Sequence, residues 1–318
     1  MNKHEKIYIA GHQGLAGSAI LRKLLSEGYE NIITKTHNEL DLTDQSAVEK
    51  FFVENKPDHV FLAAAKVGGI SANSLYPADF IYKNMLIGFN VVYASYKHGV
   101  KKLLNLGSSC IYPRDAPQPL KEEYLLTGPL EPSNNAYAIA KIAVIKLCNS
   151  FNIQYGTNYI SVMPTNLYGP GDTYDIENGH VLASLIKKFH DAKISGKNKV
   201  LLWGDGSPCR EFLYNEDLAE AVIFLMKSKE VSEIGEFINI GSGSDITIKE
   251  LADLIRSIIY AGYPENTCLI EWDNKSPNGT PRKLLDINNI TSMGWKAKTN
   301  LKEGIIKTYN SFLEINAI

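Results

Sequence analysis

Short hydrophobic runs alternate with longer amphipathic stretches through the first half of the chain. The runs have the length of buried strands and lie at residues 6–11, 31–36, 59–65, 102–108 and 159–166. Between them, hydrophobic residues recur every three or four positions, as on one face of a helix, at 15–25, 47–52, 80–96 and 137–151. Because strands that alternate with helices pair through right-handed crossovers, we predict an α/β fold whose doubly wound parallel sheet has helices on both faces.

The pattern changes after residue 168, where glycine and proline punctuate the run YGPGD. Further elements are predicted as a helix at 180–190, a strand at 200–204, a strand end and helix at 210–226, a strand at 238–243 and a C-terminal helix at 301–316. We therefore predict a large domain at 1–168 and a smaller α/β domain at 169–318. The chain is expected to cross back to the large sheet near 210–240.

The composition is that of a globular protein with one or two closely joined domains: 318 residues, 44% hydrophobic and 21% charged. The formal net charge of −2 leaves no basic excess for nucleic acid, and no hydrophobic stretch has the length of a membrane span or signal peptide. We thus expect a cytoplasmic protein with neither nucleic-acid nor membrane partners. Its four cysteines are scattered without CxxC spacing, which argues against a disulfide framework or a metal site.

A glycine-rich turn, GHQGLAG, follows the first predicted strand and opens the first predicted helix. Its glycines, Gly11, Gly14 and Gly17, form GxxGxxG, a pattern that lets the backbone approach a pyrophosphate at a helix N-terminus. This context indicates a Rossmann-like dinucleotide site in the 1–168 domain and leaves 169–318 to bind substrate. The alternative is a strand-to-helix turn that binds no ligand.

A tyrosine and a lysine, Tyr137 and Lys141, lie four residues apart and so share one face of a predicted helix. A lysine cation close to a tyrosine lowers the pKa of its phenol, which could then exchange a proton with a carbonyl or alcohol oxygen. Ser108 ends the fourth predicted strand, at the sheet edge where ligands bind, and can hydrogen-bond the same oxygen. With a dinucleotide site upstream, this set predicts a nicotinamide-dependent oxidoreductase.

The end of the second predicted strand bears on the choice between NAD and NADP. Lys35 and His37 precede the acidic residues of TKTHNELDL (34–42), and a cation there favours the 2′-phosphate of NADP. Alternatively, Lys35 is an ordinary solvated surface lysine. The small residues of AAAKVGG (63–69) either run beside the cofactor or simply pack a helix against the sheet.

Two more polar residues fall near the predicted reactive edge. Cys110 lies two residues after Ser108, although a cysteine at a strand end is more often an apolar filler than a reactive thiol. His180 begins a predicted helix, where a histidine is usually a surface or capping residue. Neither residue by itself indicates acid–base chemistry.

Seven longer segments are more specific than these short motifs. They are AAAKVGGI (63–70), YPADFI (76–81), GSSCIYP (107–113), NNAYAIAKIA (134–143), VMPTNLYGP (162–170), REFL (210–213) and GTPRKLLD (279–286). Over nearly its whole length the chain thereby resembles the GDP-L-fucose synthases of the extended short-chain dehydrogenase/reductase family. The resemblance implies a bifunctional nucleotide-sugar enzyme that epimerises carbons 3 and 5 of GDP-4-dehydro-6-deoxy-D-mannose, then reduces carbon 4 with NADPH to give GDP-L-fucose. It also implies a homodimer formed through helices.

The resemblance further implies a role for individual residues. Cys110 and His180 match the acid and base of the epimerisation, with the choice between them open. Tyr137 would protonate the carbon-4 oxygen, Lys141 would tune Tyr137 and hold the nicotinamide ribose, and Ser108 would polarise the ketone. The implied cofactor-binding residues are Gly11, Gln13, Gly14, Leu15, Ala16, Gly17, Lys35, His37, Asp41, Leu42, Leu106, Ser109, Lys141, Pro164, Thr165, Asn166, Leu167 and His180. The implied substrate-binding residues are Lys188, Trp203, Arg210 and Asn278.

Several alternatives stay open at this point. Gln13 and His37 stand where arginines are typical of the family, and Asn278 where an aspartate is typical. Trp203 could instead pack in the core, and Arg210 could form an ion pair between domains. Two other functions are a UDP-sugar 4-epimerase that keeps NAD bound and a non-catalytic dinucleotide-binding regulator. The cysteine–histidine pair argues against the first, and the complete serine, tyrosine and lysine set argues against the second.

Overall fold

The protein is built around a six-stranded parallel sheet. The computed structural model describes residues 1–176, 179–264, 267–273 and 280–316. The strands lie in the order β2 (Ile32–Lys35), β1 (Ile7–Ala10), β3 (His59–Leu62), β4 (Lys102–Leu106), β5 (Tyr159–Pro164) and β9 (Ile238–Ile240). Every neighbouring pair is parallel. Five of these strands overlap the five hydrophobic runs of the first half, and β9 joins from the second half.

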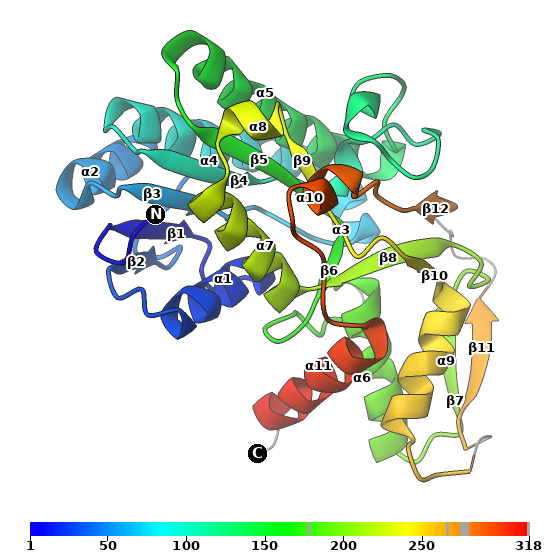
Figure 1. Cartoon of the computed structure of the whole chain (residues 1–318). Coiled ribbons are helices and arrows are strands. Elements are labelled where there is room, and N and C mark those ends of the chain that lie inside the picture. The colour runs from blue at the N-terminus through cyan, green and yellow to red at the C-terminus, as the bar shows by residue number, and fades with distance from the viewer. Residues whose placement is uncertain (177–178, 265–266, 274–279, 317–318) are drawn as a thin grey trace.

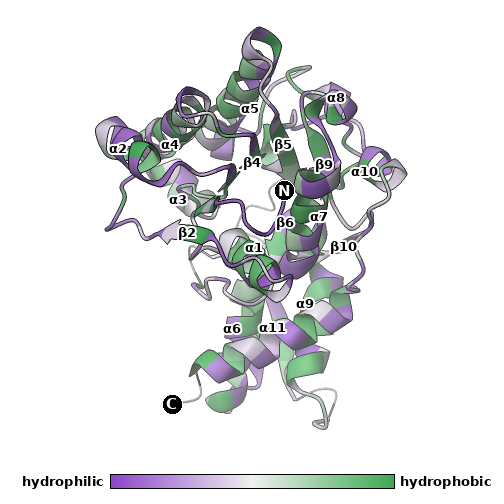
Figure 2. Cartoon of the chain, turned by 60° about the vertical axis from the view of Figure 1, so that its left-hand side comes forward, coloured by the Kyte–Doolittle hydropathy of each residue, from purple (hydrophilic) through white to green (hydrophobic). Residues whose placement is uncertain are grey.

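Helices cover both faces of this sheet (Figure 1). One face carries α1 (Leu15–Ser26) and α7 (Asn215–Ser228), and the other carries α2 (Gln45–Asn55), α4 (Pro77–Lys97) and α5 (Asn135–Tyr155). Two separate clusters of buried hydrophobic side chains result, one on each face. The prediction of a doubly wound parallel sheet is therefore confirmed. Figure 2 shows its strands largely in green, because both of their faces are buried.

The rest of the second half forms a smaller mixed region. A four-stranded sheet has β8 (Cys209–Tyr214) at its centre, paired with β6 (Asn166–Tyr168), β10 (Asp245–Thr247) and β12 (Arg282–Lys283). A separate parallel pair joins β7 (Lys199–Trp203) to β11 (Leu269–Asp273). Their hydrophobic side chains pack with α6 (Val181–Ile194), α9 (Ile248–Ile259) and α11 (Leu301–Asn316) in a core of their own. The division into domains at 168/169 stays a prediction.

Several elements have no counterpart among the sequence predictions. The largest is α9, although its sequence carries a clear start signal, because Thr247 Oγ1 accepts from the amide of Glu250 and Glu250 in turn accepts from the amide of Thr247. Its buried residues Leu251, Ile255 and Ile259 then recur at helical spacing. The other unpredicted helices are short: α3 (Ile70–Leu75), α8 (Val231–Ile234), α10 (Asn288–Ser292) and the 3-10 turns Ser109–Ile111, Glu122–Tyr124 and Pro132–Asn134.

The α5 segment contradicts the expectation from the sequence that no hydrophobic stretch has the length of a membrane span. The segment Pro132–Tyr155, which contains α5, is long and apolar enough to cross a membrane by length and composition, alone among the described residues. Here it packs on α4 and on the large sheet, and Ala138, Ile142, Ile145 and Cys148 are buried. The apolar character of α5 is thus that of a helix that helps to form the core.

A buried carboxylate ties β8 to its surroundings. Glu211 is fully buried, and its two oxygens accept from the amides of Gly243 (2.7 Å) and Leu285 (2.9 Å). Burial raises the pKa of this carboxyl. Because the backbone carbonyl of Glu211 also accepts from Thr165 and Asn166, this residue links the end of β5 to the strands of the smaller region.

Candidate active site

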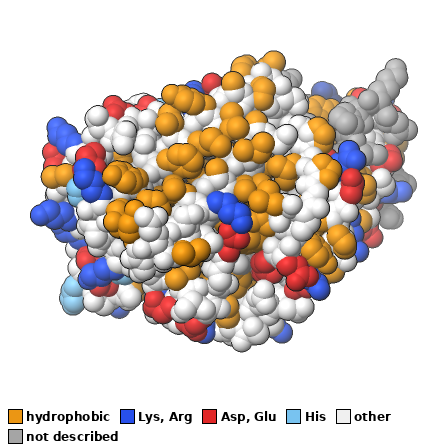
Figure 3. All heavy atoms as spheres, turned by 90° about the horizontal axis from the view of Figure 1, so that it is seen from above, with side chains coloured by type: hydrophobic (Ala, Val, Ile, Leu, Met, Phe, Trp, Pro, Cys, Tyr) orange, Lys and Arg blue, Asp and Glu red, His pale blue; other side chains and the backbone are white. Residues whose placement is uncertain are grey.

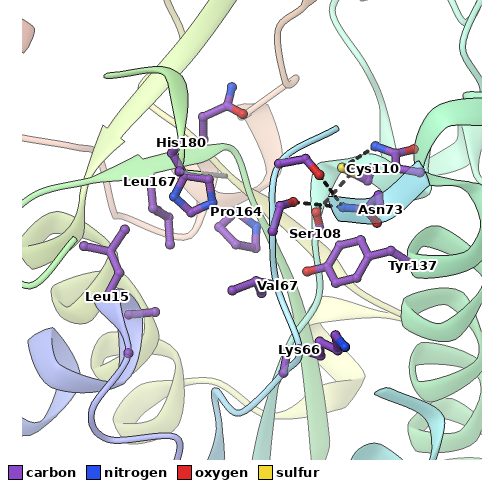
Figure 4. A pocket seen from close by; sticks show the side chains of 18 of the residues that line it. Leu15, Lys66, Val67, Asn73, Ser108, Cys110, Tyr137, Pro164, Leu167 and His180 are labelled. Atoms are coloured by element: carbon purple, nitrogen blue, oxygen red, sulfur yellow. Dashed lines mark hydrogen bonds between the residues drawn. The ribbon is translucent and has the colours of Figure 1, made fainter. Parts of the chain in front are cut away.

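A large cavity of about 940 Å³ lies at the carboxyl ends of the large sheet's strands and extends to the smaller region. Figure 4 shows part of its lining. Every sequence-predicted site residue that the structure describes lines this cavity. These are Gly11, Gln13, Gly14, Leu15, Ala16, Gly17, Lys35, His37, Asp41, Leu42, Leu106, Ser108, Ser109, Cys110, Tyr137, Lys141, Pro164, Thr165, Asn166, Leu167, His180, Lys188, Trp203 and Arg210. Asn278 lies outside the described residues.

The glycine-rich turn is so closely packed at Gly11 and Gly17 that no side chain fits at either position. Gly11 has φ +85°, and a Cβ added to it would lie 2.6 Å from the amide nitrogen of Ala64. A Cβ on Gly17 would lie 2.1 Å from the carbonyl oxygen of Gly11. Gly14 is the N-cap of helix α1 and provides no capping side chain, and Leu15, the first residue of α1, lines the cavity. Free amides at a helix N-terminus suit the pyrophosphate of a dinucleotide, so the turn fits the cofactor.

The small residues after β3 both pack closely against the glycine-rich turn and line the cavity. Ala64 is the residue that approaches Gly11, and Ala63, Ala64 and Ala65 all line the cavity. The two interpretations of AAAKVGG are therefore not exclusive, since the backbone can run close to the cavity only where side chains are small.

Cations and carboxylates alternate after β2. The Lys35 ammonium lies 3.5 Å from a carboxylate oxygen of Glu39, and His37 Nδ1 lies 4.0 Å from Asp41. His37 is exposed, and Lys35 is half-buried. Glu39 is itself held by the amide and hydroxyl of Thr36, whose hydrogen bonds lower the pKa of the carboxyl to about 2. Lys35 and His37 therefore line the cavity, each beside an acidic residue.

The predicted serine, tyrosine and lysine lie together at the end of β4. Ser108 Oγ accepts from the amide of Cys110 at 3.2 Å and shares a side-chain hydrogen bond with Tyr137. Lys141 is buried and donates from Nζ to the carbonyl of Leu106 at 2.7 Å. Its ammonium lies 5.7 Å from the centre of the Tyr137 ring. The end of β4 and the start of α5 thus bring these groups to one wall of the cavity.

The expectation that the pKa of Tyr137 is lowered was wrong. Burial raises the pKa of Tyr137, and the hydrogen bond with Ser108 only partly opposes this. Burial also lowers the pKa of Lys141 to about 8. The lysine does not offset desolvation of the phenol, because its ammonium is directed at the Leu106 carbonyl. Tyr137 is accordingly a phenol at neutral pH, the form that can donate a proton.

Cys110 has polar neighbours and is not an apolar filler. It is partly exposed, and its Sγ accepts from Asn134 Nδ2 at 3.3 Å. The ammonium of Lys283 lies 3.7 Å from the same sulfur. Cys110 thus has a hydrogen-bond donor and a cation beside its sulfur, surroundings that are typical of reactive cysteines.

His180 has a carboxylate partner, Asp172. Its Nδ1 lies 3.4 Å from Asp172 Oδ1, and this hydrogen bond raises the pKa of the imidazole. Asp172 is almost fully buried and also accepts from the amide of Thr173 at 2.8 Å. Figure 4 shows His180 and Cys110 entering the cavity from different elements, with Ser108 between them in this view.

The smaller region contributes a cationic and aromatic wall. The Lys188 ammonium lies 5.3 Å above the Trp203 ring, and burial lowers the pKa of this lysine. Trp203 is 51% exposed, so core packing does not explain it. Arg210 donates from its guanidinium to the carbonyl of Cys209 at 2.8 Å. These side chains can meet the phosphates and flat base of a nucleotide.

Sequence reasoning missed four polar residues at this site. Asn73 and Asn134 each keep a buried Oδ1 without a hydrogen-bond partner while lining the cavity. Lys283 lies beside the sulfur of Cys110, and Asp172 lies beside the ring of His180. Asn134 and Lys283 belong to the specific segments NNAYAIAKIA and GTPRKLLD, whereas Asn73 and Asp172 carry no such signal except proximity in the chain to glycine-rich turns.

Comparison with known proteins agrees with the resemblance inferred from the sequence motifs. Residues 7–241 match the NAD dependent epimerase/dehydratase family. The chain is 53% identical over 313 residues to GDP-L-fucose synthase 1 of Arabidopsis thaliana, covering 98% of this chain and 94% of the relative. It is 48% identical over 316 residues to GDP-L-fucose synthase of Escherichia coli K12, covering 98% and 97%. A GDP-D-glycero-L-gluco-heptose synthase from Campylobacter jejuni, solved in the presence of NADPH, superposes with a TM-score of 0.88 at 38% identity and 99% coverage of both chains.

Proposed function

The chain belongs to the NAD-dependent epimerase/dehydratase family, among its GDP-L-fucose synthases, and on that premise we propose that it converts GDP-4-dehydro-6-deoxy-D-mannose to GDP-L-fucose. The reaction combines epimerisation at carbons 3 and 5 with NADPH-dependent reduction at carbon 4. One observation carries the proposal. A cysteine beside a cation and a histidine beside a carboxylate share one cavity with a serine, tyrosine and lysine set.

The epimerisation needs a base on one face of the sugar and an acid on the other. The carbon-4 ketone acidifies the C–H bonds at carbons 3 and 5, because the resulting carbanion is an enolate. We assign Cys110 as the base, since its sulfur accepts from Asn134 and is close to an ammonium. We assign His180 as the acid, since Asp172 raises the pKa of its imidazole and favours the cation.

The reduction uses Ser108, Tyr137 and Lys141, which lie on the same side of the cavity as Cys110. When bound, NADPH supplies the hydride that adds to carbon 4. Tyr137, protonated through its burial, donates a proton to the carbon-4 oxygen. Ser108 hydrogen-bonds that oxygen, and Lys141 maintains a positive charge beside the phenol and can hold the nicotinamide ribose. The same contacts stabilise the enolate oxygen during epimerisation, so both half-reactions can share one site.

Residues for the two nucleotides are divided between the regions. The turn from Gly11 to Gly17 would hold the cofactor pyrophosphate, and Lys35 with His37 would favour a 2′-phosphate and hence NADPH over NADH. Arg210 and Lys188 would bind the diphosphate of the GDP-sugar, beside the Trp203 ring.

We further propose that the protein acts as a homodimer. Exposed hydrophobic side chains form a stripe on α4 at Tyr82, Phe89, Tyr93 and Tyr96, at helical spacing. Figure 3 shows hydrophobic side chains gathered over the face seen from above, the side on which α5 lies in Figure 1. A face of this kind is typical of a helix-mediated protein interface.

The proposed activity is tested with purified protein, GDP-4-dehydro-6-deoxy-D-mannose and NADPH or NADH. We expect NADPH to be oxidised, faster than NADH, with GDP-L-fucose as the product. A reduced sugar with unchanged configuration at carbons 3 and 5 would reject the roles of Cys110 and His180. Interconversion of UDP-sugars without net use of nicotinamide would instead indicate a 4-epimerase, and failure of every reaction a regulator.

A further inference from the structure

We propose that Lys283 is a positioning residue that supplies the charge holding Cys110 as a thiolate for epimerisation. The inference deepens the proposed function and rests on it. Lys283 is the last residue of β12, more than 170 positions from Cys110 in the chain, and its Nζ lies 3.7 Å from the Cys110 sulfur. Both residues line the main cavity.

The backbone around Lys283 is firmly placed. β12 pairs in parallel with β8, where Lys283 stands opposite Arg210. The next two amides are both engaged, Leu284 with Gln118 Oε1 at 2.9 Å and Leu285 with the buried Glu211 carboxylate at 2.9 Å. A lysine on so constrained a segment can hold its ammonium near one atom at a smaller entropic cost than one on a free loop.

Lys283 also differs from the other cations around the sulfur. Lys141 donates to the Leu106 carbonyl and Arg210 to the Cys209 carbonyl, whereas the ammonium of Lys283 is near the sulfur itself. Within the described residues no salt bridge involves Lys283, although many other lysines of the chain are paired. The charge of Lys283 is therefore available to a thiolate.

Each inversion in the proposed reaction requires Cys110 as a thiolate. In each inversion, the Cys110 thiolate takes the proton from the carbon beside the ketone and becomes a thiol, and the electrons of that bond form the enolate. The His180 imidazolium then protonates the same carbon from the other face and becomes neutral. Both groups must exchange protons with water before the second carbon is inverted. A cation beside the sulfur favours the return of Cys110 to the thiolate.

The test measures alkylation of Cys110 by iodoacetamide as a function of pH, with the modified peptide quantified by mass spectrometry. This distinguishes Cys110 from the partly exposed Cys209 and from the buried Cys148 and Cys268. Lys283→Met should slow Cys110 alkylation at pH 7 about tenfold and move its pH midpoint upward. Lys283→Arg should restore most of the rate, because it keeps the charge.

The matched control is Arg282→Met on the same strand. Arg282 binds Asp245 at 2.6 Å and does not line the main cavity, so this variant removes one positive charge nearby without touching the sulfur. Its alkylation rate should equal that of the wild type. The charged groups facing Cys110, namely Lys283, Lys141, Arg210 and, beyond them, Glu131, are otherwise unchanged in the control.

Two enzymatic readouts complete the test. In D₂O without NADPH, the rate of deuterium exchange into the substrate should be about tenfold lower in Lys283→Met than in the wild type. The oxidation of GDP-L-fucose by NADP⁺ needs no inversion and should persist in this variant. Equal alkylation in Lys283→Met and wild type would overturn the inference. So would a raised KM with unchanged exchange at saturation, which would make Lys283 a substrate-binding cation. Wild-type protein that converts no substrate would reject the proposed function instead, whatever the alkylation shows.

Discussion

At the scale of single residues, burial decides the protonation state that each acid–base group brings to the site. Tyr137 is enclosed, which raises the pKa of its phenol, and the Lys141 ammonium beside it remains bound to a backbone carbonyl. A protonated tyrosine suits reduction, in which the carbon-4 oxygen must gain a proton. The pKa of His180 is also raised, but there the hydrogen bond to Asp172 outweighs burial and stabilises the imidazolium.

Removal of the Tyr137 hydroxyl should stop reduction more than epimerisation. We expect Tyr137→Phe to lower NADPH oxidation about 10³-fold, the usual contribution of a general acid. Deuterium exchange into the substrate should continue, since the cysteine and histidine are intact. Tyr155→Phe, an exposed tyrosine on the same helix, is the control and should match the wild type. Full reductase activity in Tyr137→Phe would contradict the assigned role.

The pH dependence of epimerisation should report the Asp172–His180 pair. The imidazolium is the acid, so activity is present below the pKa of His180 and is lost as the pH rises through it. Because Asp172 raises that pKa, Asp172→Asn should lower it and move the alkaline limb of the exchange profile to lower pH. The limb is measured by deuterium exchange from pH 6 to 10. An unmoved limb would show that the carboxylate does not tune the acid.

At the scale of elements, the turn before α1 is so closely packed that no side chain fits at Gly17. A Cβ on Gly17 would meet the Gly11 carbonyl at 2.1 Å, whereas one on Gly14 would meet the same oxygen at 3.5 Å, an ordinary contact. The spacing of the glycines is therefore a consequence of how closely α1 packs against the end of β1.

This contrast predicts different losses from the same substitution. Gly17→Ala should displace the turn and weaken NADPH binding by more than tenfold, measured by quenching of intrinsic fluorescence or by calorimetry. Gly14→Ala should weaken it less, because the added methyl meets no short contact and φ is −78°. Thermal unfolding of both variants would show whether the fold is retained. Equal losses would mean that packing of the turn does not control the cofactor site.

At the scale of the whole molecule, the site exists because two regions meet. The large sheet supplies the cofactor turn, Ser108, Cys110 and Tyr137, and the smaller region supplies Trp203, Arg210 and Lys283. Glu211 joins the two through hydrogen bonds from three segments. The exposed stripe on α4 lies outside this site and is free for association.

The dimer proposal is tested on that stripe. Tyr93→Lys should place a charge in the apolar face and yield a monomer in analytical ultracentrifugation, where the wild type sediments as a dimer. Tyr263→Lys is the control, since Tyr263 is similarly exposed, at 52% against 48%, and lies beyond α9. A wild-type monomer, or a Tyr93→Lys dimer, would reject this interface.

The sequence by itself determined the large sheet, because five hydrophobic runs and the helices between them carry their own periodicity. It also placed the glycine turn and the serine, tyrosine and lysine set, whose members are local motifs. The tertiary structure decided what depends on long-range contacts: the pairing of β9 with β5, the short strands around β8, and Lys283 beside Cys110. It also reversed the expected shift of the Tyr137 pKa, because desolvation follows from enclosure by the fold and not from the identity of a neighbour four residues away.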